Sequence, residues 1–132
     1  MARYDPADLP DTVLAFVSDR HLATLTTLRP DGSPHVAPVG FTYDSARQLV
    51  RVITFTGSKK VRNIQANPGA RAAVCQVDAD RWLTFEGTAT VTTDPARNAE
   101  GIERYAHRYR QPGERRDRAT IEIAVDTVLG RA

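Results

Sequence analysis

Hydrophobic and polar residues alternate with a period of two along most of this chain, which is typical of strands with one buried face. The clearest example is near the end, where Ile121, Ile123 and Val125 alternate with Glu122 and Asp126. The pattern predicts six strands, over residues 21–28, 34–43, 48–55, 70–77, 81–93 and 119–129. Short turns and few helices favour a mainly β fold, a small closed or split barrel, over a doubly wound parallel sheet.

Three segments have helical spacing instead. One covers residues 9–18, with Pro10 in its first turn, and a second makes about two turns after Ser58. The third opens with Asp94 as a cap and Pro95 at the first helical position, and ends at Gln111-Pro112-Gly113. Its apolar stripe is formed by Ile102, Tyr105, Ala106 and Tyr109. Elsewhere the expected strands are separated by tight turns, such as Asp31-Gly32. Strands joined by tight turns run antiparallel, so we expect a mostly antiparallel arrangement.

Length and composition predict one domain over residues 1–132, because the chain is too short for separate cofactor and substrate domains. A ligand site must use this one core or a second copy of the chain. Eighteen Lys and Arg against sixteen Asp and Glu give a net charge of +2, which does not favour nucleic acid. The single cysteine, Cys75, cannot form an internal disulfide, and no segment looks like a signal peptide or a membrane span. We expect a cytoplasmic protein.

The most informative motif joins an apolar strand to a basic helix start, Thr54-Phe55-Thr56-Gly57-Ser58-Lys59-Lys60. Helix N–H groups and lysines at such a junction are suited to a phosphate group. The spacing is neither that of a P-loop nor that of a dinucleotide-binding fingerprint. Taken alone, the motif fits a solvated helix cap equally well.

Other chemistry is weakly indicated. The three histidines have no metal-ligand spacing with each other or with Cys75, so no metal site is predicted. Six arginines crowd the third helix and the loop after it: Arg104, Arg108, Arg110, Arg115, Arg116 and Arg118. They either bind carboxylate groups or form a solvated face.

Several motifs together carry a resemblance to a known family. They are Pro30-Asp31-Gly32-Ser33-Pro34-His35 after the strand 22–27, the segment 50–63 with its Ser-Lys-Lys-x-x-Asn pattern, and Arg81-Trp82-Leu83-x-x-Glu86-Gly87. This combination resembles the split β-barrel flavin and deazaflavin oxidoreductases, which include pyridoxamine 5′-phosphate oxidase. With segments 104–110 and 128–130, the chain is similar to the coenzyme F420-dependent biliverdin reductases of actinobacteria.

The resemblance implies a six-stranded split barrel that forms a homodimer with the cofactor site at its interface. The phosphate-bearing tail is expected at Ser58, Lys59, Lys60 and Asn63. The ring is expected along two strands, at Pro38, Val39 and Gly40 and at Ile53, Thr54 and Phe55. Trp82 is expected to meet the cofactor from the partner subunit; otherwise it is a core or interface anchor.

The implied reaction needs no catalytic side chain, because a flavin-type ring transfers the hydride itself. The expected cofactor is coenzyme F420, with FMN as the alternative, and the expected acceptor is a conjugated tetrapyrrole such as biliverdin, reduced to bilirubin. Candidate substrate-binding residues are His35, Arg104 and Arg108. Three alternatives stay open: an FMN-dependent oxidase of the pyridoxamine phosphate type, a non-catalytic carrier of a cofactor or haem, and a barrel without a ligand.

Overall fold

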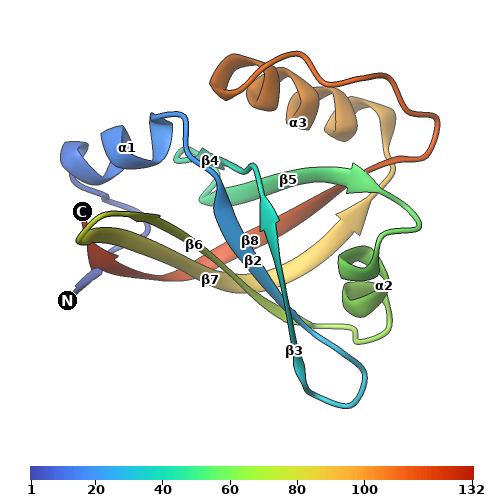
Figure 1. Ribbon diagram of the computed structural model, residues 1–132, viewed down its shortest axis with the longest axis horizontal. Helices are drawn as coiled ribbons and strands as arrows, with labels where there is room; N and C mark the ends of the chain where they lie inside the picture. Colours follow the sequence, from blue (N-terminus) through green and yellow to red (C-terminus); the bar gives the residue numbers. More distant parts are fainter.

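The computed structural model describes residues 1–132 and contains one antiparallel sheet with three helices around it (Figure 1). The strands are β1 (Ala2–Tyr4), β2 (Ala23–Leu28), β3 (Pro34–Val39), β4 (Thr42–Asp44), β5 (Leu49–Phe55), β6 (Arg71–Asp78), β7 (Arg81–Thr92) and β8 (Arg118–Arg131). The helices are α1 (Asp11–Ser18), α2 (Lys59–Gln65) and α3 (Pro95–Arg108). None of these helices combines the length and apolarity needed to span a membrane.

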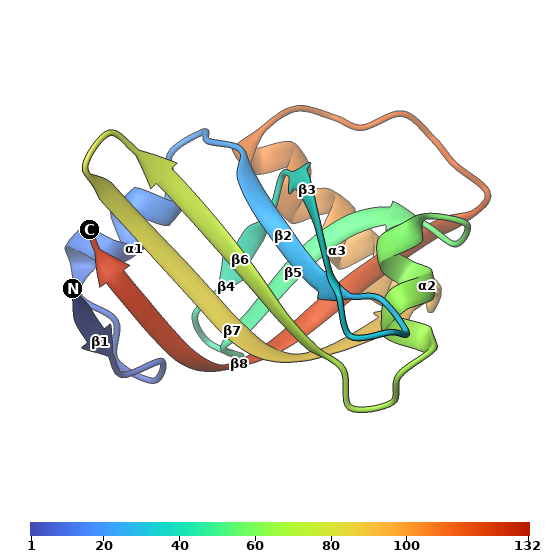
Figure 2. The same cartoon turned by 60° about the horizontal axis from the view of Figure 1, so that its bottom comes forward.

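The sheet curls into a barrel that stays open along one side. Its strand order is β3-β2-β6-β7-β8-β5-β4, with β1 added to β8. All pairs are antiparallel. The long strands β7 and β8 lie near the middle of this order, away from the open side (Figures 1 and 2). β3 and β4 follow each other in the chain but lie at the two ends of this order. The mainly β, split-barrel prediction is confirmed.

The predicted count of six strands is wrong, because the sheet has eight. The segment predicted as one strand over residues 34–43 divides at Gly40-Phe41, where β3 ends its pairing with β2 and β4 begins to pair with β5. The short β1 was also missed. Three residues carry too little pattern to predict a strand, and the partners of β1 lie at the far end of the chain.

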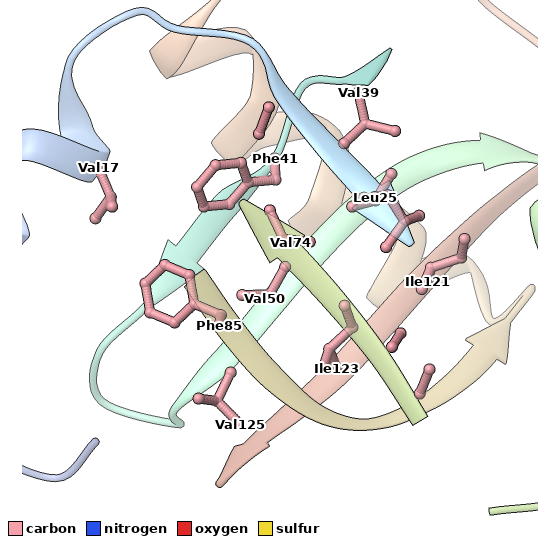
Figure 3. Packing of buried hydrophobic residues seen from close by; sticks show 14 of the residues in the cluster. Val17, Leu25, Val39, Phe41, Val50, Val74, Phe85, Ile121, Ile123 and Val125 are labelled. Atoms are coloured by element: carbon pink, nitrogen blue, oxygen red, sulfur yellow. The ribbon is translucent and has the colours of Figure 1, made fainter. Parts of the chain in front are cut away.

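Apolar side chains from all sides of the curl meet in one core (Figure 3). Phe41 and Phe85 contact each other edge to face, with ring centroids 6.0 Å apart. Ile121 and Ile123 belong to the same cluster and come from β8, the strand that pairs with the β7 of Phe85. α1 covers one end of the barrel with Val13, Phe16 and Val17, as its amphipathic pattern predicted.

α3 packs on the outer face of β5 and β8 through polar and small residues rather than through an apolar stripe. Its buried residues are Asn98 and Gly101. The Asn98 side chain donates to the carbonyl of Arg118 at 3.1 Å and accepts from the Thr120 hydroxyl at 2.7 Å. A Cβ on Gly101 would lie 3.0 Å from Cγ2 of Ile53, so the helix sits directly on the strand.

Buried charges complete this contact. Asp44 of β4 accepts from Arg51 at 3.0 Å and pairs with Arg104 of α3 at 3.2 Å. Glu122 was expected to face solvent, but it is buried and pairs with Arg97, because α3 covers this part of β8. The outer face of β8 is therefore polar where α3 covers it.

Candidate cofactor site

A cavity of about 250 Å³ lies in the open seam of the barrel, between the ends of β3 and β5. Its lining comes from β3 and the residue after it, β5, α2, α3, the loop before β8 and the start of β8: Pro38, Val39, Gly40, Val52, Ile53, Lys60, Tyr105, Pro112 and Arg118. The pairing of β4 with β5 reaches only as far as Arg51, and β3 pairs only with β2. Both strand edges therefore face the seam with backbone groups that no neighbouring strand uses.

Lys60 brings an unpaired positive charge to this cavity. Its side chain is half-buried and makes no hydrogen bond or ion pair within the chain. Burial lowers the pKa of Lys60 because the ammonium group loses water without gaining a partner. An anion in the cavity would remove this cost.

Arg118 supplies a second cation at the same cavity. It is the first residue of β8, and its pairing with Phe55 carries it to the end of β5. The guanidinium donates to the carbonyls of Thr54 at 3.3 Å and Gly113 at 2.8 Å, while its buried Nε has no partner. No carboxylate lines the cavity, so the two cations remain available for an anionic ligand.

Tyr105 of α3 forms the remaining wall, and Tyr109, the residue that follows α3, packs beside it with its ring centroid 4.9 Å away. A Cβ on Gly40 would lie 2.9 Å from the ring of Tyr105 and 3.1 Å from that of Tyr109, so a glycine is needed for this close approach. The Tyr109 hydroxyl donates to the carbonyl of His21 at 2.6 Å and accepts from the N–H of Phe41 at 3.2 Å. Burial is the main cause of the raised pKa of the Tyr109 hydroxyl. The wall is therefore aromatic and fixed in position.

Five residues predicted for the cofactor line this cavity: Pro38, Val39, Gly40, Ile53 and Lys60. The other residues of the predicted phosphate motif lie outside its lining. Ser58 caps α2 by accepting from the N–H of Val61, Asn63 donates to Thr27 at 3.0 Å, and Lys59 is exposed. Thr54 is buried and meets the site through the carbonyl bound by Arg118, and the ring of Phe55 lies beneath Arg115.

Trp82 does not reach the cavity of its own chain. It shares the outer face of the sheet with Pro38, because the register links Pro38 to Thr24, Thr24 to Cys75 and Cys75 to Thr84, two residues along β7 from Trp82. Three strand spacings separate Pro38 from Thr84 by roughly 14 Å along the sheet, and Trp82 lies farther still. Trp82 therefore shares a sheet face with Pro38, one residue of the cavity lining, but lies on a different strand.

The predicted substrate residues have other surroundings. Arg104 is bound by Glu100 and Asp44. Arg108 donates to Gln76 and to the carbonyls of Asp19 and Phe41, and burial lowers its pKa. His35 lies on β3 opposite Thr27, with a buried Nδ1 that has no partner. Both guanidinium groups thus anchor α3 to the barrel.

The cavity also has lining residues that the sequence did not assign to the cofactor, namely Val52, Tyr105, Pro112 and Arg118. Tyr105 and Arg118 were noted only as part of a helical stripe and an arginine cluster. The available signal was Gly40, whose missing side chain indicates a close approach but not its partner. Together, the two cations, the aromatic wall and the free strand edges fit a planar polar ring that carries a phosphate.

Comparison with known proteins agrees with this chemistry. Residues 9–132 match the family described as pyridoxamine 5′-phosphate oxidase. This chain belongs to that family. It is 48% identical over 124 residues to an F420H(2)-dependent biliverdin reductase of Mycobacterium tuberculosis (strain CDC 1551 / Oshkosh), covering 94% of this chain and 89% of the relative.

Solved structures support the fold of this family member. A protein described as an F420 reductase superposes with a TM-score of 0.71 at 27% identity, covering 92% of this chain and 98% of the other. A conserved hypothetical protein from Mycobacterium tuberculosis gives a TM-score of 0.79 at 20% identity, covering 99% and 89%. The resemblance inferred from the sequence motifs is confirmed.

Proposed function

We propose that this protein is an oxidoreductase that binds reduced coenzyme F420 and reduces biliverdin to bilirubin. The observation that carries the proposal is the unpaired, half-buried Lys60 beside Arg118 in the seam cavity. The relative named as an F420H(2)-dependent biliverdin reductase supports the choice of cofactor and acceptor.

Lys60 and Arg118 would hold the phosphate of the cofactor, and the free edges of β3 and β5 would bind the polar edge of its ring. When bound in reduced form, the deazaflavin supplies a hydride to the acceptor, and a proton from water completes the reduction. Tyr105, packed against Tyr109, would exclude water from one side of the seam. No side chain of this chain needs to act as an acid or base.

A neighbouring cavity of about 500 Å³ extends the positive surface. It shares Pro112 and Arg118 with the seam cavity and is also lined by Arg115, Arg116 and one carboxylate, that of Glu114. Arg115 pairs with Asp117, whereas Arg116 has no partner. The carboxylates of a glutamyl tail attached to the cofactor phosphate would bind here.

The working unit would be a homodimer. Trp82 and Pro38 lie on one outer sheet face, and no helix covers β6 and β7 on this side (Figure 2). The same face exposes Val36 and Val77, at 58% and 59% of their surface. A second copy packed on this face would bury these residues and bring the partner's Trp82 toward the seam.

The test is a fluorescence titration of the protein with F420 and with FMN, with Lys60→Ala as the variant. F420 should bind tighter than FMN, and Lys60→Ala should weaken F420 binding roughly tenfold or more because a charge-assisted phosphate contact is lost. Lys59→Ala is the matched control, because Lys59 is exposed and outside the cavity. Equal F420 affinity in wild type and Lys60→Ala would refute the phosphate site, and tighter FMN binding would refute the cofactor assignment.

Turnover is tested separately. With F420H2 as the electron donor, the wild-type protein should convert biliverdin to bilirubin, which is followed by the loss of biliverdin absorbance at long wavelength. F420 binding without this reaction would contradict the proposed acceptor.

A further inference from the structure

Two arginines near α3 remain free of protein partners. Arg104 and Arg108 are held by carboxylate, amide and carbonyl groups, whereas Arg20 and Arg110 are exposed and make no hydrogen bond or ion pair. Arg20 lies two residues after α1, and Arg110 lies two residues after α3. The fold brings both side chains to the lining of one cavity although they are far apart in the sequence.

This cavity has a volume of about 500 Å³, and six residues line it: Arg20, His21, Leu22, Tyr105, Tyr109 and Arg110. Tyr105 also lines the seam cavity, so the two spaces adjoin at one aromatic ring. The cavity with Arg115 and Arg116 adjoins the seam at other residues, Pro112 and Arg118. A cofactor tail in the cavity with Arg115 and Arg116 and an acceptor in the cavity with Arg20 and Arg110 would therefore occupy different spaces beside the seam.

The lining has both apolar and cationic parts. Leu22 is 64% exposed, and the rings of Tyr105 and Tyr109 lie with their centroids 4.9 Å apart beside it. The carboxylate of Asp78 approaches this region, but it pairs with His21 at 3.5 Å and does not pair with either arginine. The surface therefore fits a ligand with a flat apolar body and carboxylate arms.

We propose that Arg20 and Arg110 form a carboxylate-binding subsite that holds the propionate groups of the acceptor beside Tyr105. This inference rests on the proposed function, because it takes a tetrapyrrole with two propionates as the acceptor. Bidentate guanidinium contacts would orient the tetrapyrrole with its conjugated body toward the seam. The two arginines thus determine specificity for an acidic acceptor.

The experiment measures binding of biliverdin and of its dimethyl ester by isothermal titration calorimetry, with and without saturating oxidised F420. Wild type should bind the diacid roughly tenfold more tightly than the ester. The double variant Arg20→Gln/Arg110→Gln should bind both with the same, weaker affinity. Arg3→Gln is the matched control, because Arg3 is exposed, unpaired and outside this cavity. Circular dichroism and a thermal melt verify that each variant is folded.

The outcomes separate this inference from the proposed function. Unchanged diacid binding in the double variant would overturn the subsite while wild type still reduces biliverdin. The other source of carboxylates is the cofactor tail: if the double variant loses affinity only for F420 with its glutamyl tail, and not for the tail-less deazaflavin, the acceptor assignment is wrong. Failure of wild type to bind F420 or turn over biliverdin would refute the proposed function, and biliverdin binding without F420 still reports on the arginines.

Discussion

The seam cavity depends on a side chain that is absent. Gly40 allows Tyr105 and Tyr109 to lie against the backbone where β3 ends, and Tyr109 is fixed there by two hydrogen bonds. We expect Gly40→Ala to displace Tyr105, because its ring would be 2.9 Å from the new Cβ. The variant should lose about 1–3 kcal/mol of stability and bind F420 more weakly. Urea unfolding and fluorescence titration measure the two effects.

Gly113→Ala provides the comparison for Gly40→Ala. A Cβ at Gly113 would meet no atom within 4 Å, so this substitution should leave stability nearly unchanged. Equal F420 affinity in Gly40→Ala and wild type would show that the tyrosine wall does not shape the site.

The residues of the site differ in how far the sequence could predict them. Lys60 was predicted from the family resemblance, which assigned a phosphate to the basic helix start; the chemistry of the motif alone fitted a solvated cap equally well and did not distinguish Lys60 from Lys59. Arg118 and Tyr105 reach the same cavity only through the β5 and β8 register and the packing of α3. These are long-range contacts that no local pattern encodes.

Among the elements, α3 is held to the barrel by ion pairs, and none of its fully buried residues has a large apolar side chain. Asp44 is central, because its side chain is 2% exposed and is bound by Arg51, Arg47 and Arg104. We expect Asp44→Asn to destabilise the fold by about 3–5 kcal/mol at pH 7, since it leaves the buried guanidinium of Arg51 with only the more distant carboxylate of Glu122, 4.0 Å away. Urea unfolding at pH 7 measures the loss. Asp126→Asn, which removes an exposed pair with Arg71, should cost about 1 kcal/mol or less.

The same carboxylate gives α3 a defined sensitivity to acid. Burial alone would raise the pKa of Asp44, but hydrogen bonds from Arg51 and Arg47 outweigh burial and hold the pKa below its usual 3.8. The unfolded chain therefore binds a proton at Asp44 before the folded chain does, so this stabilisation is full above the unfolded value and is lost as pH falls through the folded value. Melting temperatures between pH 6 and pH 2.5 should show wild type and Asp44→Asn converging below about 3.8. A constant difference across this range would contradict the assignment.

Helix and strand positions were largely predictable, but the way α3 packs was not. The stripe of Tyr105 and its neighbours predicted the helix correctly. Its buried contacts are made instead by Asn98 and Gly101, whose partners are supplied by β5 and β8. Likewise, the alternation of β8 predicts that Glu122 is exposed, whereas in the structure α3 covers it and it is buried. A polar strand position can be buried when a helix from elsewhere in the chain packs on it, and periodicity within the strand does not predict this.

At the scale of the whole molecule, the seam exists because consecutive strands join opposite ends of the sheet. Gly40 and Phe41 carry the chain from β3, at one end, to β4 at the other. A gap with two free strand edges remains between them. The outer face beside this gap is not covered by a helix, and the proposed dimer would place a second copy there.

The dimer can be tested on this face without altering the cavity of the chain itself. Val77 pairs with Trp82 across β6 and β7 and is 59% exposed, so Val77→Glu should place a charge in the proposed interface while the monomer still folds. Sedimentation should give twice the chain mass of 14.6 kDa for wild type and a single chain for the variant. F420 binding should weaken together with dimerisation, and Val77→Thr should change neither. If Val77→Glu is monomeric and binds F420 as wild type does, one chain contains the whole site and Trp82 has no role in it.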